Sequence, residues 1–505
     1  MSDPRSYGLD QAFDPVERID THGAIVFLAG TRAYKLKRAV CFPFMDLSTL
    51  ARREEACKAE IAINKPLAPE IYIDAVAITR GPSRELTING QGEAIDWAVE
   101  MHRFDTGQTF DQLAAANALD DDDLDKAIDV AVAFQARAPE RRASDWIADL
   151  GGYIEHNDQA FLEAPAIFSR PAVSELTART IEKWKSLEPL LLQRGQAQRV
   201  RRAHGDMHLR NIVKLKDSIR LFDAIEFDDR IATGDVLYDL AFLLMDLDHL
   251  GLRDKANRAL NRYLSAPTGP GDLDGLAALP FYMSMRAALR AKICAMSAAH
   301  QTGTDAMRSK AEARNLFTYA ADMLEPRDLS LTVIGGLSGT GKSRLAQALA
   351  PRLGCSPGAV IIRSDIVRKS LLESRPEEKL GPSAYQRSVS QTVYAEMARQ
   401  AAVTLEAGQS VVVDAVFATA QERQAIEDVA LAAECHFAAV WLDAPLETRL
   451  ARVEKRFGDA SDADSRVVAL QQDYDLGVMD WPLLDSSGSF EKVCERVRRA
   501  IDRLN

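Results

Sequence analysis

Two carboxylates and an amide lie close together in the middle of the chain. Asp206 and Asn211 belong to the run His204-Gly205-Asp206-Met207-His208-Leu209-Arg210-Asn211, and Asp223 follows the apolar pair Leu221-Phe222. Phosphoryl transfer to a hydroxyl requires a group that orients and deprotonates the acceptor, and metal ligands that help neutralise the phosphate charge. Asp206 suits the first task, and Asn211 and Asp223 offer the oxygen ligands that Mg²⁺ prefers. These residues therefore predict a phosphoryl-transfer site.

Histidines lie on both sides of this first carboxylate, at His204 and His208. We interpret both as residues that brace the loop rather than as catalysts. A zinc site is not expected, because no matching set of cysteines and histidines accompanies them.

A glycine-rich motif later in the chain indicates a second nucleotide site. It reads Gly336-Leu337-Ser338-Gly339-Thr340-Gly341-Lys342-Ser343, after an apolar strand and before a helical stretch. In such a loop, successive backbone N–H groups surround the phosphates at the start of the helix. The residues expected to bind nucleotide in this way are Gly336, Ser338, Gly339, Thr340 and Gly341. Lys342 is expected to reach the β- and γ-phosphates, and the Ser343 hydroxyl to bind Mg²⁺.

Further polar residues follow the strands after this motif. Asp365 comes just past the strand 360–362, and Asp414 ends the strand 411–413 as a carboxylate of the Walker B type. Ligands of open parallel sheets bind at these carboxyl ends of strands. The three arginines Arg449, Arg452 and Arg456 then occupy a predicted helix. Arg449 and Arg452 can share a helix face and reach the transferring phosphate, although a solvated face is an equal alternative.

Two patterns of elements position these residues. In the first half, strands at 24–28, 33–37, 71–78, 86–88 and 97–101 and a helix at 48–63 precede mostly helical sequence from 109 to 192 and from 238 to 324. From residue 329 onward strands and helices alternate, which predicts a parallel sheet covered by helices. The acidic run 120–123 is interpreted as a helix start rather than a metal site.

Composition limits the possible functions. The net charge of −12 disfavours a broad nucleic-acid surface, and no apolar run is long enough to span a bilayer. The six cysteines are scattered and contain no CxxC pair, which is typical of free thiols in a reducing compartment. A cytoplasmic enzyme is expected.

The run His204-Gly205-Asp206-x-His208-x-x-Asn211 resembles the catalytic loop of aminoglycoside and choline phosphotransferases, which are relatives of protein kinases. The resemblance implies that Asp206 is the catalytic base, that Asn211 binds metal and that Asp223 is the main metal ligand. It also implies Glu226 as a secondary metal candidate and a structural role beneath the loop for Asp239.

Such a kinase also requires a strand lysine on the phosphates and a helix glutamate that holds it. Glu60 suits the glutamate, and Lys35 and Lys37 are both candidates for the lysine, since alternation places them on one strand face. Lys35 is slightly preferred, and at least one of the two is expected to be a solvated edge charge. The stretch 99–104, which includes Met101, should form the hinge whose backbone meets adenine. No GxGxxG loop is present.

The second half resembles the small P-loop kinases, a group that includes gluconate, shikimate and polynucleotide 5′-kinases and zeta-toxin-type kinases. The resemblance implies that Asp365 is a base, that Arg368 binds substrate and that 449–456 forms a mobile lid closed by the turn 458–464. The order of the two halves resembles a bacterial group of fused phosphotransferase and ATP-binding proteins.

The predicted fold class is an α+β protein-kinase-like two-lobed domain followed by an α/β P-loop domain with a parallel sheet. The expected bounds are 1–104 for the N-lobe, 105–325 for the helical C-lobe and 326–505 for the P-loop domain. The predicted function is a bifunctional kinase with two independent sites, which uses ATP and Mg²⁺ to phosphorylate small-molecule hydroxyl acceptors.

Three alternatives stay open: one domain is a nucleotide sensor that regulates the other, the second half is a nucleic-acid 5′-hydroxyl kinase, or the P-loop serves a non-catalytic binding module. A membrane partner is not expected, and the sequence does not decide the oligomeric state or the acceptors.

Overall fold

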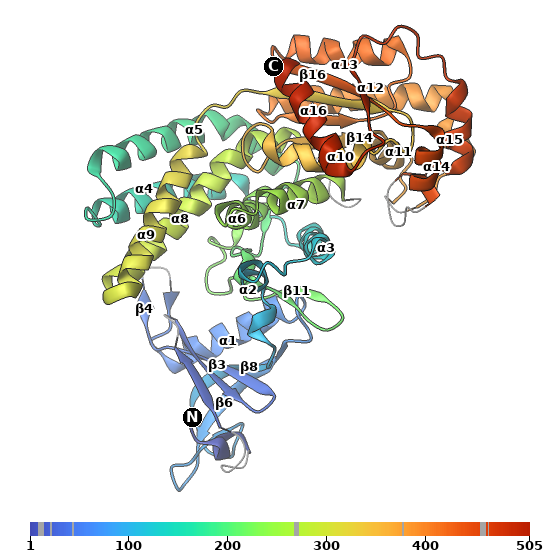
Figure 1. Ribbon diagram of the computed structural model, residues 1–505. Helices are drawn as coiled ribbons and strands as arrows, with labels where there is room; N and C mark the ends of the chain where they lie inside the picture. The colour runs from blue at the N-terminus through green and yellow to red at the C-terminus, as the bar shows by residue number, and fades with distance from the viewer. Residues whose placement is uncertain are drawn as a thin grey trace. The chain divides into compact units, whose positions relative to one another are not determined.

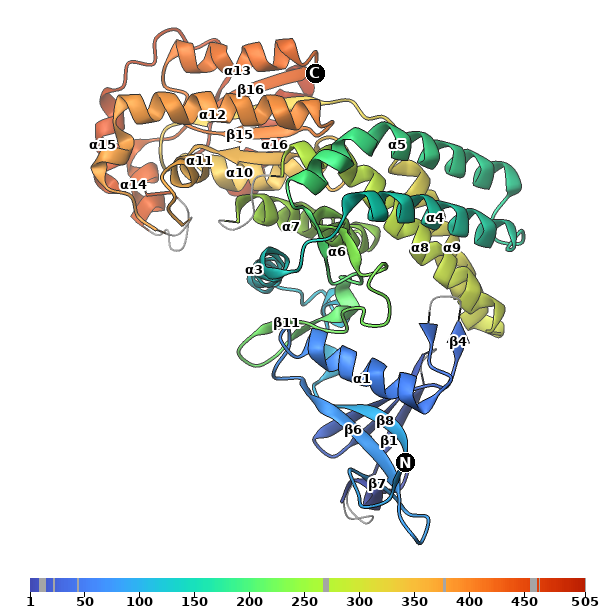
Figure 2. The same cartoon turned by 180° about the vertical axis from the view of Figure 1, so that it is seen from behind.

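The computed structural model describes residues 1–8, 15–20, 23–42, 45–266, 272–375, 378–454, 461–462 and 464–504 (Figures 1 and 2). The chain divides into two compact units. The first comprises Met1–Asp149 and Leu191–Leu243, and the second comprises Leu150–Leu190 and Leu244–Asn505. The second unit therefore contains helices from the first half of the chain together with the P-loop region.

The first unit contains a six-stranded antiparallel sheet in the order β1-β2-β3-β8-β6-β7. Its strands are β1 (Glu17–Asp20), β2 (Ala24–Ala29), β3 (Arg32–Lys37), β6 (Tyr72–Arg80), β7 (Leu86–Ile88) and β8 (Glu93–His102). A tight turn at Gly30, where φ is 58°, joins β2 to β3. In this register Lys35 lies between Val26 of β2 and Val99 of β8. The strands predicted in this region are confirmed.

Helix α1 (Leu50–Asn64) packs against β6 and β8. Thr49 caps its start, because the Thr49 hydroxyl accepts from the Arg52 N–H at 3.3 Å. Such a cap satisfies one of the N–H groups that a helix start leaves without a partner. The buried face of α1 carries Glu60, which is 0% exposed. A fully buried carboxylate requires charged partners, and α1 therefore delivers Glu60 to lysines of the sheet.

The rest of the first unit consists of helices and short antiparallel ribbons. They are β4 (Cys41–Phe42), β5 (Met45–Asp46), α2 (Phe110–Ala115), α3 (Asp121–Arg137), β9 (Val200–Arg202), β10 (Ile212–Lys214), β11 (Ile219–Leu221) and β12 (Thr233–Asp235). Asp120 caps α3 by accepting from the Asp122 N–H at 2.8 Å, which confirms that the acidic run is a helix start.

Longer helices complete the first half of the chain. They are α4 (Ala143–Leu162), α5 (Arg170–Gln196), α6 (Val236–His249), α7 (Arg253–Ser265), α8 (Leu279–Ala299) and α9 (Gly303–Asp322). Helices α4, α5 and α6 contribute residues to both units. The predicted helical character of this region is confirmed. Within the described part of the chain, no helix is both long enough and apolar enough to cross a bilayer.

The P-loop region forms a five-stranded parallel sheet in the order β14-β15-β13-β16-β17. Its strands are β13 (Ser330–Gly336), β14 (Val360–Arg363), β15 (Val411–Asp414), β16 (His436–Asp443) and β17 (Leu483–Asp485). Its helices are α10 (Lys342–Leu349), α11 (Ser364–Leu371), α12 (Arg387–Glu406), α13 (Ala420–Ala432), α14 (Leu446–Glu454), α15 (Ser465–Leu470) and α16 (Phe490–Leu504). Helices α10 and α16 cover one face of the sheet, and α12 and α13 cover the other (Figures 1 and 2). The structure thus confirms the predicted fold class, a kinase-like α+β part followed by a parallel P-loop sheet.

Within the second unit, helix α7 lies along the edge strand β14. The Asn261 Oδ1 accepts from the Ile361 N–H at 2.7 Å, and the Asn257 Nδ2 donates to the Ala359 carbonyl at 2.9 Å. The Arg253 guanidinium donates to the Gly354 carbonyl at 3.0 Å. Exposed edges of sheets are liable to pair with other chains unless they are covered. The asparagines of α7 therefore take the place of a sixth strand beside β14.

We expect Asn261→Ala to destabilise the second unit, because the Ile361 N–H loses its acceptor. A fully buried donor left without a partner costs about 1–3 kcal/mol, and this partly buried N–H should cost about 1 kcal/mol. Each kcal/mol corresponds to a melting temperature lower by roughly 2–4 °C in a domain of this size. Thermal unfolding measures the change. Asn315→Ala, at an exposed position on α9, is the matched control. Equal melting temperatures for the two variants would contradict the proposed cover of the edge.

Candidate active sites

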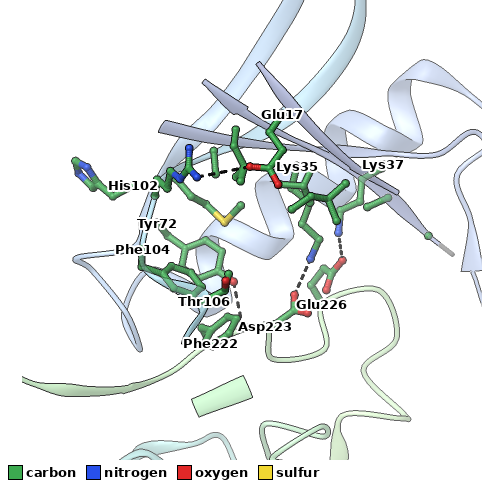
Figure 3. Close-up of a pocket in the computed structure, with 18 of the residues that line it drawn as sticks. Glu17, Lys35, Lys37, Tyr72, His102, Phe104, Thr106, Phe222, Asp223 and Glu226 are labelled. Carbon is green, nitrogen blue, oxygen red and sulfur yellow. Dashed lines mark hydrogen bonds and ion pairs between the residues drawn. The ribbon is translucent and has the colours of Figure 1, made fainter. Parts of the chain in front are cut away.

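The first site is a cavity of about 980 Å³ in the first unit (Figure 3). Apolar side chains of the sheet, among them Val26, Leu28 and Ala33, line it together with Met101 and Phe222. Lys35, Lys37, Asp206, Asp223 and Glu226 line it as well. Small-molecule sites combine such apolar walls with a few converging polar groups. The cavity therefore brings together most of the residues expected at the first site.

An alternating series of charges crosses this cavity. The Lys35 Nζ lies 2.9 Å from the Glu60 Oε1 and 2.6 Å from the Asp223 Oδ1. Lys37 pairs with the same glutamate and with Glu226. Figure 3 shows Lys35 directed toward Asp223 and Lys37 directed toward Glu226. Both lysines therefore face the site, and the expectation that at least one is a solvated edge charge is wrong, because α1 and the Asp223 loop cover this face of β3.

Charge pairing determines the protonation of the buried glutamate. Burial alone would raise the pKa of Glu60, but Lys35 and Lys37 outweigh it and lower the pKa to about 2. Opposite charges at this distance favour the ionised form. Glu60 therefore stays a carboxylate and fixes both lysine side chains.

The two lysines are expected to differ when they are replaced. Lys37→Met should destabilise the first unit by about 3–5 kcal/mol, because it leaves the buried Glu226 without its paired cation and Glu60 with Lys35 alone. Lys35→Met should cost less, because its partner Asp223 is 42% exposed and can be hydrated. Chemical denaturation compares the two variants, and Lys37→Met/Glu226→Gln should recover part of the loss. A larger loss for Lys35→Met would contradict these roles.

The loop around Asp206 is braced from several sides. The Asn211 Nδ2 donates at 3.0 Å both to the Asp206 Oδ2 and to its backbone carbonyl, and the His208 Nε2 lies 3.3 Å from the Asp206 Oδ2. Gly205 has a φ of 83°, and a Cβ there would lie 3.2 Å from the Ala232 backbone. Glycine relieves both constraints. The Asp206 carboxylate is thus held in one orientation at the edge of the cavity.

Asp239 and His204 hold the backbone of the Asp206 loop through hydrogen bonds. The Asp239 carboxylate accepts from the backbone N–H groups of His204 and Gly205, each at 3.0 Å, and the His204 Nε2 donates to the Phe222 carbonyl at 3.0 Å. Burial lowers the pKa of His204, which keeps the imidazole neutral. These contacts confirm that His204 and His208 brace the loop.

The Asp223 loop has a strained start and its own supports. Asp223 has a φ of 61°, and its N–H donates to the Tyr72 hydroxyl at 3.1 Å. Asn64 binds both backbone groups of Ala224, at 2.7 Å and 3.1 Å. Sequence reasoning missed Tyr72 and Asn64, because neither belongs to a motif with a fixed spacing from Asp223.

The donors of this site suit a hard cation. Asp223 offers a carboxylate to the cavity, and the Phe222 N–H donates to the Asn211 carbonyl at 3.0 Å, which ties the Asp223 loop to the Asn211 loop. Among the described residues no group of three His, Cys, Asp or Glu side chains could hold a metal ion. Kinase sites commonly bind Mg²⁺ through one or two side chains together with phosphate oxygens. The pair Asn211 and Asp223 fits that chemistry.

The hinge segment meets the cavity through residues 101–106. Met101 is the penultimate residue of β8, and the N–H groups of His102 and Arg103 donate to the carbonyls of Ile71 and Thr31. Phe104 packs edge-on against Phe222, with ring centroids 5.2 Å apart. Val99 lies buried in the sheet instead of lining the cavity.

The second site surrounds the P-loop between β13 and α10. Gly336, Gly339 and Gly341 have φ values of 140°, 85° and 94°. A Cβ on Gly339 would lie 2.6 Å from the Arg449 carbonyl, so only glycine fits there. The Lys342 Nζ donates to the Leu337 carbonyl at 3.2 Å, and so does the Thr340 hydroxyl at 2.8 Å. The motif therefore forms the compact loop expected before a helix.

Both arginines of α14 bind this loop from its carbonyl side. Arg449 is 3% exposed and donates to the Ser338 carbonyl at 3.1 Å and the Val468 carbonyl at 3.0 Å. Arg452 donates to the Thr340 carbonyl at 3.3 Å and the Ser486 carbonyl at 2.7 Å. Neither lies on a solvated face. Arg456 and residues 458–460 and 463 of the expected lid turn lie outside the described residues.

Gln471 also binds the P-loop, and sequence reasoning missed this residue. Its Oε1 accepts from the Ser338 N–H at 2.7 Å. Ser338 is thus held at its N–H by Gln471 and at its carbonyl by Arg449. No local sequence signal links Gln471 to the P-loop, since 133 positions separate it from Ser338.

Asp365 and Arg368 lie on α11, at the carboxyl end of β14. Burial raises the pKa of Asp365, and Asp414 acts in the same direction, against Ser461, Arg363 and Lys342. Arg368 is buried, donates to the Ala384 carbonyl at 2.7 Å and lies 4.8 Å from the Tyr385 ring centroid. Electrostatic interactions thus link Asp365 to Lys342 and Asp414.

Ser343 and Asp414 are joined by a residue that sequence reasoning did not select. The Arg363 Nη2 donates to the Ser343 hydroxyl at 3.1 Å, and the Arg363 Nε lies 3.4 Å from the Asp414 Oδ2. The hydroxyl and the carboxylate are suitable oxygen donors for Mg²⁺. The sequence signal that could have identified Arg363 is its position at the end of β14, two residues before Asp365.

Two parts of the chain match known family models. Residues 47–279 match the Phosphotransferase enzyme family, and residues 331–474 match the AAA domain. Uncharacterized proteins of Mycobacterium tuberculosis and Mycobacterium bovis are 29% identical over 477 residues, which cover 91% of this chain and 90% of theirs.

Solved kinase structures are also similar to parts of the chain. A choline kinase from Cryptosporidium parvum aligns with 62% of this chain and 90% of its own, at 12% identity and a TM-score of 0.40. A gluconokinase from Sinorhizobium meliloti aligns with 35% of this chain and 93% of its own, at 18% identity and a TM-score of 0.27.

Proposed function

Since residues 47–279 form a phosphotransferase-family domain and residues 331–474 an AAA-type P-loop domain, the protein is a phosphotransferase, and we propose that both domains are active kinases. Each uses MgATP and transfers the γ-phosphate to a hydroxyl of a small-molecule acceptor. The observation that carries this proposal is that each domain has its own nucleotide-site candidates with a carboxylate beside them, Asp206 in the first cavity and Asp365 near Lys342.

At the first site the proposed reaction follows from the braced loop. Asp206 accepts the proton of the acceptor hydroxyl while the new O–P bond forms and the bond from the γ-phosphorus to the ADP oxygen breaks. Lys35, held by Glu60, binds the phosphates, and Asn211 and Asp223 would hold Mg²⁺. When bound, the ion neutralises phosphate charge.

At the second site Asp365 is the proposed base. Its raised pKa favours proton acceptance, because a general base works best with a pKa close to the ambient pH. Lys342 and the P-loop N–H groups bind the phosphates, Ser343 and Asp414 would hold Mg²⁺, and Arg368 contacts the acceptor. Arg449 and Arg452 support the loop through its carbonyl groups.

The test uses γ-labelled ATP and a pool of small alcohols and metabolites. The purified full-length chain is compared with its Asp206→Asn and Lys342→Ala variants, and labelled products are separated by chromatography. Two active kinases predict that each substitution removes a different product or a different phosphate of one product. Loss with only one substitution supports the sensor alternative, and labelling that depends on neither contradicts the kinase proposal.

A further inference from the structure

Arg363 occupies an unusual place in the second site. It is the last residue of β14, and its side chain is 14% exposed. The guanidinium reaches the Ser343 hydroxyl at 3.1 Å and the Asp414 carboxylate at 3.4 Å. These two oxygens are the ones that the proposed function assigns to Mg²⁺. A cationic side chain thus lies between both metal-ligand candidates.

The positive charge at this point is permanent. A guanidinium does not lose its proton in a protein, and its planar set of five donors suits carboxylate and phosphate oxygens equally. Asp414 is almost fully buried, so it requires a cation close by. Arg363 supplies that charge through the protein itself, without an ion from solution.

A divalent ion and this guanidinium cannot bind the same pair of oxygens together, because their charges repel at contact distance. When MgATP enters, the guanidinium has to leave Ser343 and Asp414. The guanidinium then needs another anion, and the phosphates that enter with the ion supply one. Arg363 acts electrostatically on Asp365, where Lys342 acts as well. Both cations therefore lie where the proposed transfer takes place.

We propose that Arg363 holds the metal position of the second site, excludes free divalent ions, and moves onto the nucleotide phosphates when MgATP binds. The inference rests on the proposed function for the identity of the metal ligands. It assigns two roles to one side chain, exclusion of the bare ion and recognition of the metal–nucleotide complex. Free Mg²⁺ therefore binds weakly, and the ion enters together with the phosphates.

The first measurement is Mn²⁺ binding to the full-length chain without nucleotide, followed by electron paramagnetic resonance. All samples carry Asp223→Ala, which removes the main metal-ligand candidate of the first site. Arg363→Gln should bind Mn²⁺ about tenfold or more tightly than its parent, which corresponds to about 1.4 kcal/mol. Arg363→Lys, which keeps a positive charge, should resemble the parent.

The second measurement is the affinity of the same proteins for a fluorescent ATP analogue with Mg²⁺. Arg363→Gln should bind it about tenfold more weakly, because a cation on the phosphates is lost. Arg344→Gln is the matched control. Arg344 lies on helix α10, and its guanidinium packs over the Phe490 ring of α16, 3.9 Å from the ring centroid. This variant should change neither affinity.

Two outcomes would overturn the inference. The first is that Arg363→Gln binds Mn²⁺ no more tightly than its parent. The second is that Arg363→Gln lowers the melting temperature while both affinities stay at the parent values, which would make Arg363 a purely structural contact. If Arg363→Gln fails to fold, Arg363→Lys is compared with the parent instead. Much tighter Mn²⁺ binding by Arg363→Lys than by the parent would contradict the inference. Since both measurements omit the acceptor and turnover, they are independent of whether phosphoryl transfer is found.

Discussion

Asp206→Asn is expected to abolish phosphoryl transfer at the first site, with kcat lower by about 10²–10⁴-fold, the usual contribution of a general base. The substitution keeps the size of the side chain but removes its negative charge and its ability to accept a proton. The partners Asn211 and His208 stay in place, so the fold and the affinity for nucleotide should change little. Initial rates and nucleotide titrations measure both quantities on the same preparation.

Asp217→Asn provides the matched control, because Asp217 is exposed in the turn between β10 and β11 and belongs to the same unit. It should leave kcat unchanged. A first-site product that forms at the parental rate with Asp206→Asn would exclude this carboxylate as the base. A large loss of nucleotide affinity with unchanged kcat would instead indicate a role in binding.

Lys342→Ala is expected to remove the activity of the second site, with a loss of about 10²–10³-fold in kcat, as for other groups that stabilise developing charge. The Lys342 Nζ donates to the Leu337 carbonyl of the P-loop, so the ammonium group lies within the loop that is proposed to bind the phosphates. Nucleotide affinity of this site should fall too, because the phosphates lose a positive charge. Equilibrium binding of an ATP analogue and product formation measure the two effects.

The control for this experiment is Lys492→Ala, at an exposed position on α16 in the same unit. It removes one lysine without contact to the P-loop. The first-site product should survive Lys342→Ala if the two kinases act independently. Simultaneous loss of both products would contradict independence and would favour regulation of the first site by the second.

Much of this protein could be predicted from local sequence. The P-loop was found because its glycines, lysine and serine are contiguous between a strand and a helix. The Asp206 loop and Asp223 could be predicted for the same reason. Alternation along β3 placed Lys35 and Lys37 on one face, and the structure agrees. Each of these features depends on neighbours only a few residues away.

Tertiary structure alone decided which distant side chains meet. Lys35 binds Asp223 across 188 positions, Ser338 binds Gln471 across 133, and Ile361 binds Asn261 across 100. It also decided that Arg363 bridges Ser343 and Asp414, and that α7 covers β14 within one compact unit. The physical reason is the range of the interactions. Periodicity and turn preferences act between adjacent residues, whereas ion pairs and edge contacts form only after the chain path has brought remote segments within about 3 Å of each other.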